Sequence, residues 1–466
     1  MKNGGCETCG LRESTFGLEY TQKLDGTYEV IGIGTCSDTG IVIGIYNNCS
    51  VTSIGESAFY KCTNLTNVTI DKCVTNISSY AFSSCTSLTN FVIPDTVIGL
   101  GSRVFAGCSN LVNITVESNN ECYKSINGNI YTKDGKSLVF YAPGKTESNF
   151  TIPSSVVSIN KGAFYSCIHI ENVTFHDDII RIGKSAFEGC TGLKNITLGN
   201  NVTSIGSSAF EDCTKLTSIT IPDSVTSIGE DAFGGCDNLT YKEYGNGLYL
   251  GNSTNPYLVL IKAKNDTITS CNIHANAKII YFRAFYSCDS LTSIVIPDSV
   301  TSIGSSAFEG CTSLTSIVIP DSVTSIGSYA FSRCYSLTSM TIGASVTSIG
   351  DSAFEDCTNL KNIIINSNVT TFGWLAFSGC SSLTNITIPD SVTSIDNSVF
   401  YKCSNLTSII IGNSIKSIGI NAFRYCTSLT TLKYRGSKEQ WNAISKGSNW
   451  DSDTGNYTIT YNYEGE

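Results

Sequence analysis

Residues 307–327 of this chain read Ala-Phe-Glu-Gly-Cys-Thr-Ser-Leu-Thr-Ser-Ile-Val-Ile-Pro-Asp-Ser-Val-Thr-Ser-Ile-Gly. The motif that opens this stretch, Ala-Phe-x-x-Cys-x-x-Leu, recurs fourteen times with small variations, 23 residues apart except for steps of 59 and 52 residues. The cysteines that mark the copies are Cys62, Cys85, Cys108, Cys167, Cys190, Cys213, Cys236, Cys288, Cys311, Cys334, Cys357, Cys380, Cys403 and Cys426. A fixed period in this range predicts a solenoid of stacked coils.

Each copy contains a helical pattern followed by a strand pattern. The helical spacing that indicates one face of a short helix or 3₁₀ turn is held by Ala307, Phe308, Cys311 and Leu314. Ile317 and Ile319 then alternate with outward-facing residues, as in a strand, and Pro320 ends the pairing because it has no N–H to donate. Gly327 permits the bend into the next coil, through a positive φ or through a close backbone approach.

Together with Val323 and Ile326, these apolar positions give eight core side chains per coil. Each contributes roughly 1.5–3 kcal/mol when fully buried. Ordering the 23 residues of one coil costs at least as much, so a lone coil should not fold. The pattern therefore predicts that neighbouring coils stabilise one another and that the array folds as a unit.

The overall composition limits the classes of partner. The 466 residues are 41% hydrophobic and only 15% charged, so Ser, Thr and Asn must cover the surface. A net charge of −10 argues against nucleic acids and anionic membrane surfaces as partners, because both select clusters of Lys and Arg. No apolar run approaches the length of a membrane span, so we expect no membrane insertion. The start of the chain lacks the apolar stretch of a secretory signal, which predicts a cytoplasmic protein or a truncated or mature form of an exported one.

The repeat cysteines are expected to be buried free thiols. Stacked coils place equivalent side chains about 4.8 Å apart and parallel, whereas a disulfide needs Cβ atoms nearer about 3.8 Å with crossing vectors. Among the 21 cysteines, the repeat positions should therefore pack as small hydrophobic residues.

The repeat unit resembles a known family. Leu314-x-x-Ile317-x-Ile319 fits the L-x-x-L-x-L core of leucine-rich repeats, and the full unit closely resembles the BspA-type leucine-rich repeat family over roughly residues 40–433. The resemblance implies a leucine-rich repeat solenoid of about 14 coils, each a short strand plus a short helix or 3₁₀ turn. It also implies a bacterial surface or secreted protein that adheres to host matrix or cell-surface proteins and is not an enzyme through its repeats.

The flanks and breaks suggest a domain organisation. We expect a disordered tail over 1–15, an N-terminal cap over 16–50, the solenoid over 51–433 with hairpin insertions near 117–149 and 241–271, and a C-terminal cap over 434–466. Trp441 and Trp450 could cover the open end of the last coil. The insertions, both rich in tyrosine, are either projecting hairpins that shape a binding surface or internal spacers with a small sheet of their own.

Candidate chemistry is sparse. The candidate metal, acid/base or redox groups are His176-Asp177-Asp178 and Cys6-x-x-Cys9. His176 lies at a turn position where polar residues are expected, and Cys6 and Cys9 lie in a terminal Gly-rich segment with no second pair at a suitable spacing. The sequence therefore predicts no catalytic, cofactor or metal site.

The exposed side of the strand ladder is the predicted binding surface. Its outward positions are Asn67, Thr69, Asn113, Thr115, Asn172, Thr174, Asn195, Thr197, Ser218, Thr220, Asn385 and Thr387. Rows of small polar groups suit a broad, low-charge contact with a matrix or cell-surface protein or a glycan; the alternative is a structural spacer or display stalk whose polar rows only solvate the strands. An ice-binding surface is disfavoured because apolar residues interrupt the rows, at Val92, Val295, Val318, Ile364 and Ile410. The sequence does not indicate the oligomeric state.

Overall fold

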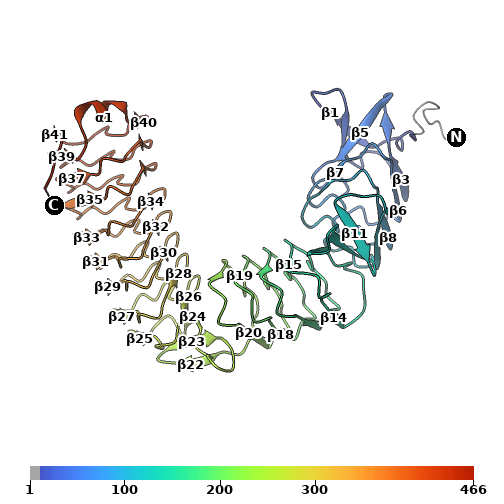
Figure 1. Ribbon diagram of the computed structural model, residues 1–466, viewed down its shortest axis with the longest axis horizontal. Helices are drawn as coiled ribbons and strands as arrows, with labels where there is room; N and C mark the ends of the chain where they lie inside the picture. Colours follow the sequence, from blue (N-terminus) through green and yellow to red (C-terminus); the bar gives the residue numbers. More distant parts are fainter. Residues whose placement is uncertain (1–10, 466) are drawn as a thin grey trace. The chain divides into compact units, whose positions relative to one another are not determined.

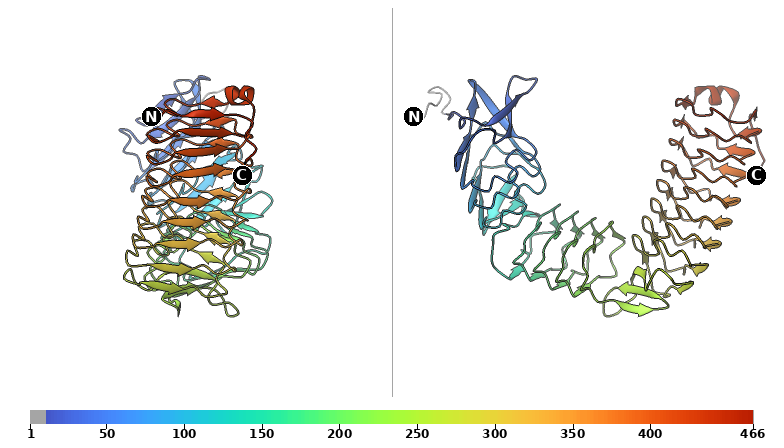
Figure 2. Two further views of the ribbon diagram at one scale, coloured as in Figure 1. Left: turned by 90° about the vertical axis from the view of Figure 1, so that its left-hand side faces the viewer. Right: turned by 180° about the vertical axis from the view of Figure 1, so that it is seen from behind.

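The computed structural model describes residues 11–465, which form two compact units that divide between Thr240 and Tyr241 and that we call unit 1 and unit 2. Each unit is a β-solenoid, as predicted: coils of about 23 residues stack so that strands of successive coils lie one above another (Figures 1 and 2). There are about 19 coils rather than the predicted 14. The excess arises at the breaks and at the ends of the chain, where strands continue the stack without carrying the cysteine motif.

The predicted core positions are confirmed in the coil that opened the sequence analysis. Its eight inward residues, from Ala307 to Ile326, are all buried, and none is more than 3% exposed. Residues between them alternate outward, so the same spacing that identified the strands also separates the core from solvent.

Two parallel strand ladders run along each unit, and we call them the first and second ladder. The first ladder contains the strands of the Leu-x-x-Ile-x-Ile pattern. In unit 1 these are β3 (Gly40–Ile43), β6 (Asn67–Ile70), β8 (Asn90–Ile93), β10 (Asn113–Val116), β14 (Asn149–Thr151), β16 (Asn172–Thr174), β18 (Asn195–Thr197) and β20 (Ser218–Thr220). In unit 2 they are β25 (Ser270–Asn272), β27 (Ser293–Val295), β29 (Ser316–Val318), β31 (Ser339–Thr341), β33 (Asn362–Ile364), β35 (Asn385–Ile388), β37 (Ser408–Ile411), β39 (Thr431–Tyr434) and β41 (Thr458–Thr460).

The second ladder contains the short strands that precede the bend. In unit 1 these are β2 (Tyr28–Gly32), β5 (Cys49–Ile54), β7 (Asn76–Ile77), β9 (Gly99–Leu100), β13 (Ser137–Phe140), β15 (Ser158–Ile159), β17 (Arg181–Ile182), β19 (Ser204–Ile205) and β21 (Ser227–Ile228). In unit 2 they are β24 (Val259–Ala263), β26 (Ile279–Ile280), β28 (Ser302–Ile303), β30 (Ser325–Ile326), β32 (Ser348–Ile349), β34 (Thr371–Phe372), β36 (Ser394–Ile395), β38 (Ser417–Ile418) and β40 (Ser445–Lys446).

The third side of each coil is a run of turns, and the predicted short helix is not formed there. Bonds of the i to i+3 kind do occur, for example from the Glu309 N–H to the Ser306 carbonyl at 3.2 Å. However, alternate N–H groups donate to the next coil instead: Phe308 to the Ala330 carbonyl at 2.8 Å, and Gly310 to the Ser332 carbonyl at 2.9 Å. Of the predicted short helix or 3₁₀ turn, the structure therefore has turns with bonds of the i to i+3 kind, and the motif spacing marks one buried face as predicted.

Two residues of every turn run lie in the left-handed region, which stops a helix from continuing. They are the residue two before the repeat phenylalanine, such as Ser306 with φ 53°, and the residue before the repeat cysteine, such as Gly310 with φ 75°. All fourteen copies follow this rule at both positions, mostly without glycine. In a four-residue turn, a positive φ at the third position is typical of type II geometry.

Gly327, by contrast, is conformationally ordinary. An added Cβ there would lie 2.5 Å from the Ser305 nitrogen and 2.6 Å from the Gly304 carbonyl carbon. Of the two explanations considered for this glycine, the structure therefore supports close backbone approach between coils.

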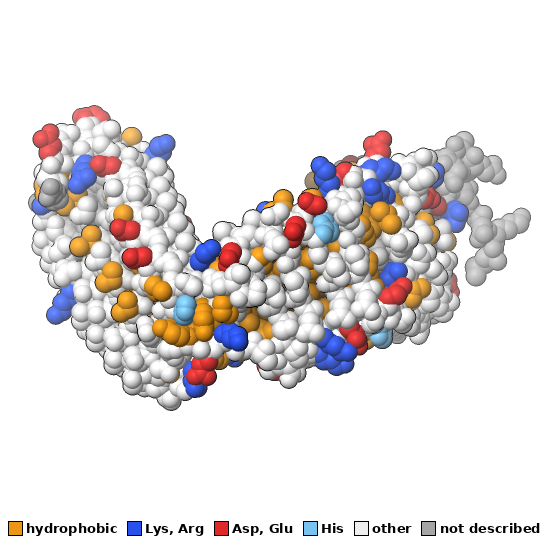
Figure 3. Space-filling model, turned by 60° about the horizontal axis from the view of Figure 1, so that its bottom comes forward, with side chains coloured by type: hydrophobic (Ala, Val, Ile, Leu, Met, Phe, Trp, Pro, Cys, Tyr) orange, Lys and Arg blue, Asp and Glu red, His pale blue; other side chains and the backbone are white. Residues whose placement is uncertain are grey.

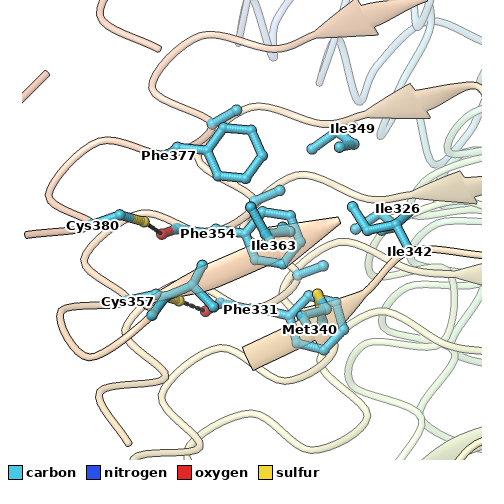
Figure 4. Close-up of a cluster of buried hydrophobic side chains, with 14 of the residues drawn as sticks. Ile326, Phe331, Met340, Ile342, Ile349, Phe354, Cys357, Ile363, Phe377 and Cys380 are labelled. Carbon is cyan, nitrogen blue, oxygen red and sulfur yellow. Dashed lines mark hydrogen bonds between the residues drawn. The ribbon is translucent and has the colours of Figure 1, made fainter. Parts of the chain in front are cut away.

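Phenylalanine and cysteine stack in adjacent columns inside the core (Figure 4). The Phe331 and Phe354 rings are 5.5 Å apart and 3° from parallel, and the Phe354 and Phe377 rings follow at 5.2 Å. The Cys357 thiol donates to the Phe331 carbonyl of the preceding coil at 3.1 Å, and ten other repeat cysteines make the equivalent bond. All fourteen repeat cysteines are free thiols, as predicted, and all are buried except Cys62, which is half-buried.

Each break in the repeat contains a small antiparallel sheet whose last strand joins the second ladder. In unit 1, β11 (Tyr123–Ile126) and β12 (Asn129–Thr132) form a hairpin, and β13 then pairs in parallel with β15. In unit 2, β22 (Lys242–Tyr244) and β23 (Gly247–Leu250) precede β24, which pairs with β26. Each insertion therefore has a small sheet of its own, and its role as a binding surface or as a spacer stays a prediction.

The two ends of the chain are covered differently. At the N-terminal end, β1 (Glu19–Gln22) pairs antiparallel with β2, and the short β4 (Ile45–Tyr46) pairs with β5. Residues 12–15 hydrogen bond to residues 42–45, so this part of the predicted tail is paired with the sheet. Residues 1–10, with Cys6 and Cys9, lie outside the described residues.

At the C-terminal end lies α1 (Lys438–Ala443), the only helix among residues 11–465. The hydroxyl of Ser437 caps its start, accepting from the Gln440 N–H at 3.3 Å. Trp441, only 4% exposed, lies 6.0 Å from the Trp450 ring, which in turn contacts the edge of the last repeat ring, Phe423, at 6.1 Å. The two tryptophans thus lie over the end of the phenylalanine column.

Candidate functional site

Six of the twelve predicted ladder residues lie together on the first ladder of unit 1. Asn172, Asn195 and Ser218 are in register on β16, β18 and β20, and Thr174, Thr197 and Thr220 form the neighbouring row. The other six lie on separate sheets, as pairs on β6, β10 and β35: Asn67, Thr69, Asn113, Thr115, Asn385 and Thr387. All twelve are exposed or half-buried, so they face outward as predicted, but they do not form one continuous row.

The polar groups of this ladder bond to one another along the stack. The Asn172 amide donates to Asn149 Oδ1 at 2.9 Å, and the Ser218 hydroxyl donates to Asn195 Oδ1 at 2.7 Å. The side chains of Asn172, Asn195 and Ser218 therefore already have hydrogen-bond partners inside the protein.

Flanking threonines serve the stack in the same way. The Thr338 hydroxyl donates to the Thr315 carbonyl at 3.2 Å, and the Thr315 hydroxyl donates to the Thr292 carbonyl at 3.4 Å. Thr217 repeats the contact in unit 1, where it donates to the Lys194 carbonyl at 3.2 Å. These repeated threonines satisfy carbonyl groups of the preceding coil, which explains their recurrence without any ligand.

The first insertion covers part of the predicted surface. The Ile114 N–H of β10 donates to the Gly128 carbonyl at 3.0 Å, and the Val116 N–H donates to the Ser125 hydroxyl at 3.1 Å. The β11–β12 hairpin thus occupies one edge of β10. Asn113 and Thr115 are half-buried in consequence.

An exposed apolar row runs along the first ladder of unit 2, and we call it the apolar row. Val295, Val318 and Ile364 are 76%, 66% and 65% exposed at the same outward position of β27, β29 and β33. Thr341 lies between them, in register with Val318 on one side and Ile364 on the other. Hydrophobic side chains gather in patches on the otherwise polar surface drawn in Figure 3.

Sequence reasoning recorded these residues only as interruptions of a polar row. The two-residue alternation already placed them outward, and three large β-branched residues on a solvent-facing sheet are the type of feature that marks a contact surface. That signal was available in the sequence and was missed because the regular polar positions received the attention.

A cluster of rings lies at the start of the same ladder. Tyr257 stacks on His274 at 3.9 Å, and the edge of Tyr244, which is 39% exposed, contacts the same imidazole at 4.7 Å. The Tyr249 hydroxyl accepts from the backbone N–H of His274 at 3.2 Å. Burial raises the pKa of Tyr249 to about 12. Because Asn272 pairs with Val295, His274 and its rings lie next to the first residue of the apolar row.

The groups considered for chemistry are engaged in turns or lie apart. His176 Nε2 is 3.1 Å from the Pro153 carbonyl, and its Nδ1 accepts from the Asp178 N–H at 3.3 Å. No group of three or more His, Cys, Asp or Glu side chains in residues 11–465 is arranged to hold a metal ion. Within the same range, no helix has the length and apolar character needed to cross a membrane.

Comparison with known proteins identifies the repeat. The family model described as BspA type leucine rich repeat region (6 copies) matches residues 31–134, 136–254, 264–380 and 324–447. A search of the curated proteins found no match.

Several of the similar solved structures are bacterial leucine-rich repeat proteins. A leucine-rich repeat protein from Bacteroides ovatus is 25% identical, covers 96% of this chain and 98% of its own, and has a TM-score of 0.34. A leucine rich cell surface protein from Faecalibacterium prausnitzii is 24% identical, covers 93% and 97%, and has a TM-score of 0.32. A leucine-rich repeat protein from Eubacterium ventriosum is 24% identical, covers 68% and 93%, and has a TM-score of 0.40. Because these TM-scores are low, the family assignment rests on the repeat itself.

Proposed function

This chain belongs to the BspA type leucine rich repeat family, and on that premise we propose that it is a non-catalytic binding protein of the bacterial cell surface or its surroundings. Its partner is a matrix or cell-surface protein, and the contact surface is the first ladder of unit 2. The proposal thus keeps the predicted class of partner but moves the contact from the polar rows to the apolar row.

The single observation that carries the proposal is the exposure of Val295, Val318 and Ile364 in one row on a hydrogen-bonded sheet. A β-branched side chain gains roughly 1.5–3 kcal/mol when it moves from full exposure to full burial. A protein partner that covers the row would bury all three, together with the serine and asparagine side chains of the neighbouring row. The sheet is rigid, so little conformational entropy is lost on binding.

The expected affinity of one such surface is modest. The row lacks tryptophan and arginine, which usually concentrate binding energy, and only the Tyr244, Tyr257 and His274 cluster adds aromatic surface beside it. Several chains displayed together on a surface would raise the overall strength of attachment without new contacts.

The test replaces each residue of the apolar row with threonine, which stands at the equivalent position of several first-ladder strands in unit 1. The triple variant Val295→Thr, Val318→Thr and Ile364→Thr should fold normally and weaken binding to a responsive member of a panel of matrix proteins, such as fibronectin and fibrinogen, by about tenfold or more. The control variant is Val112→Thr with Ile168→Thr, two residues of unit 1 that are 45% and 44% exposed. Equal binding by both variants, or no binding by the natural chain to any panel protein, would contradict the proposal.

A structural spacer is a second candidate, favoured by one observation in unit 1. There Asn172 bonds to Asn149 and Ser218 bonds to Asn195 of the preceding coil, so these side chains already serve the stack. If unit 1 acts only as a structural spacer or display stalk, then Thr174→Lys and Thr197→Lys should leave binding to every protein of the same panel unchanged.

A further inference from the structure

The second ladder of unit 1 carries an open groove of about 540 Å³, large enough for more than a single ion. Its floor is formed by the strands β15, β17, β19 and β21 and the glycines that follow three of them. Three cationic side chains line it, Lys161, Arg181 and Lys184, and all three are exposed. We call this feature the cationic groove.

These cations come from adjacent coils. Arg181 pairs with Ser158 on one side and with Ser204 on the other. The carbonyl of Lys184 accepts from the Gly162 N–H at 3.0 Å, which places Lys184 beside the residue that follows Lys161. Because neighbouring coils are about 4.8 Å apart, three positive charges lie within a short stretch of groove.

None of the three is neutralised by the protein. Among the ion pairs of the described residues, Lys194 pairs with Glu171 and Arg103 pairs with Glu188, but Lys161, Arg181 and Lys184 pair with no acidic group. An uncompensated cluster of this kind stands out on a chain with a net charge of −10. It raises the local concentration of anions by long-range attraction.

The backbone adds donors at the same place. The residues that follow the second-ladder bend of successive coils form a row. In this row, a backbone N–H can donate to a side-chain oxygen of the preceding coil. The Trp374 N–H donates to Asp351 Oδ1 at 2.8 Å, and the Ile420 N–H donates to Asn397 Oδ1 at 2.7 Å. In the groove, the preceding residues of this row are Lys161 and Lys184, which have no oxygen to offer. The N–H groups of Lys184 and Ser207 accordingly have no protein acceptor within residues 11–465.

We propose that the cationic groove binds an acidic polysaccharide, whose sulfate or carboxylate oxygens take the place that Asp351 and Asn397 oxygens hold elsewhere in the row. Lys161, Arg181 and Lys184 supply charge, and the N–H groups of Lys184 and Ser207 supply directed hydrogen bonds. Sugar hydroxyls meet the polar side chains of the groove, namely Ser158, Asn160, Ser204, Ser207 and Ser227.

The lining favours a glycan over a nucleic acid. It contains no aromatic side chain on which a base could stack, and stacking supplies much of the affinity for single strands. The cationic stretch is also short, because Ser207 and then Glu230 follow Lys184 in the same row. The inference does not depend on the apolar row, which lies on another ladder in the other unit.

The experiment measures binding of the full chain to heparin oligosaccharides, with uncharged dextran and an oligothymidylate as comparison probes. The variant Lys161→Ser, Arg181→Ser and Lys184→Ser uses the residue that neighbouring coils place at these rows, so it should fold. The control removes the same charge outside the groove through Lys215→Ser, Lys242→Ser and Lys361→Ser.

We expect heparin binding that weakens with added salt, that the groove variant reduces by about tenfold or more, and that the control variant keeps. Dextran should not bind. Unchanged heparin binding in the groove variant, equal losses in both variants, or oligothymidylate binding as tight as heparin binding would each overturn the proposal. Absence of heparin binding by the natural chain would overturn it as well.

Discussion

Eleven of the fourteen repeat cysteines both fill the core and carry a hydrogen bond between coils. Each of these thiols donates to the phenylalanine carbonyl of the preceding coil, at 3.2 Å for Cys334 and 3.1 Å for Cys357. Burial raises the pKa of the Cys190 and Cys357 thiols from the ordinary 9.0 to about 12, because the charged thiolate would lose its hydration. These side chains are therefore inert toward oxidants and alkylating reagents while the coil is folded.

The raised pKa values predict that the protein loses stability in alkali. The folded state holds its thiols protonated while the unfolded chain releases their protons above pH 9, so stability is complete below that pH and falls as pH rises toward about 12. Thermal unfolding midpoints measured from pH 7 to 11 should show this decline, and Cys357→Ala should make it shallower. An equal slope in the variant would mean that other groups cause the loss.

Ser352 offers a stabilising substitution at a single residue. It is fully buried in the left-handed region with φ 52°, and its hydroxyl has no hydrogen-bond partner among the described residues. Ser352→Gly removes both penalties and should stabilise the protein by about 1 kcal/mol or more. Urea titrations of both variants measure the effect. Ser352→Val, which is strained at positive φ, should have a lower unfolding midpoint than the natural chain. A lower midpoint for the glycine variant would contradict this account.

The left-handed positions show where residue-level prediction stops. Glycine at 327 attracted attention because glycine often marks a positive φ, yet the positive φ values lie at Ser306, Arg333 and similar residues that carry no such mark. They are held in place by the contacts of the stacked coils, which act between residues far apart in sequence. The core positions, in contrast, were predictable because burial repeats in every copy.

At the scale of the element, one coil has three hydrogen-bonded sides that surround the column of phenylalanine side chains. The Phe308 ring lies 5.1 Å from both Phe285 and Phe331 and nearly parallel to each. A cavity at this point would therefore be shared with two neighbouring coils.

Phe308→Ala should be strongly destabilising. Loss of a fully buried phenylalanine costs about 3–5 kcal/mol through lost transfer energy and the remaining cavity. Val318→Ala in the same coil is the matched control, because Val318 is 66% exposed and its change should stay within about 0.5 kcal/mol. Similar urea midpoints for the two variants would show that the phenylalanine column carries little of the stability.

The breaks in the repeat were only partly predictable at this scale. Hairpin insertions were predicted near 117–149 and 241–271, and a hairpin forms in each, between β11 and β12 and between β22 and β23. What local signals could not reveal is that β13 and β24 continue the second ladder in parallel with β15 and β26, because that pairing joins segments about 20 residues apart with no shared motif. The apolar row escaped prediction for a different reason, since each of its residues is unremarkable alone and only their alignment across coils is informative.

At the scale of the whole molecule, open ends are the weak points of an array whose interior coils cover one another. The C-terminal end of the column is covered by Trp441 and Trp450, whereas the third tryptophan, Trp374, is 51% exposed on the surface. This contrast provides a matched pair of changes.

The double variant Trp441→Ala and Trp450→Ala should uncover the last coil and make the protein associate end to end. Light scattering after size-exclusion chromatography should show larger species and the thermal midpoint should fall, while Trp374→Ala should remain like the natural chain. A monodisperse double variant with an unchanged midpoint would mean that other residues of the end suffice.

The direction of the bonds between coils has a mechanical consequence for the attachment role proposed above. In the ladders and in the turn runs, these bonds connect one coil to the next, so they point along the stack within each unit. A force that pulls the two ends of a unit apart would load the bonds between coils one coil at a time. Each released coil would add about 75 Å of unfolded chain. Under tension such a tether would lengthen in even steps at low force and dissipate a sudden load instead of transmitting it to the bound partner.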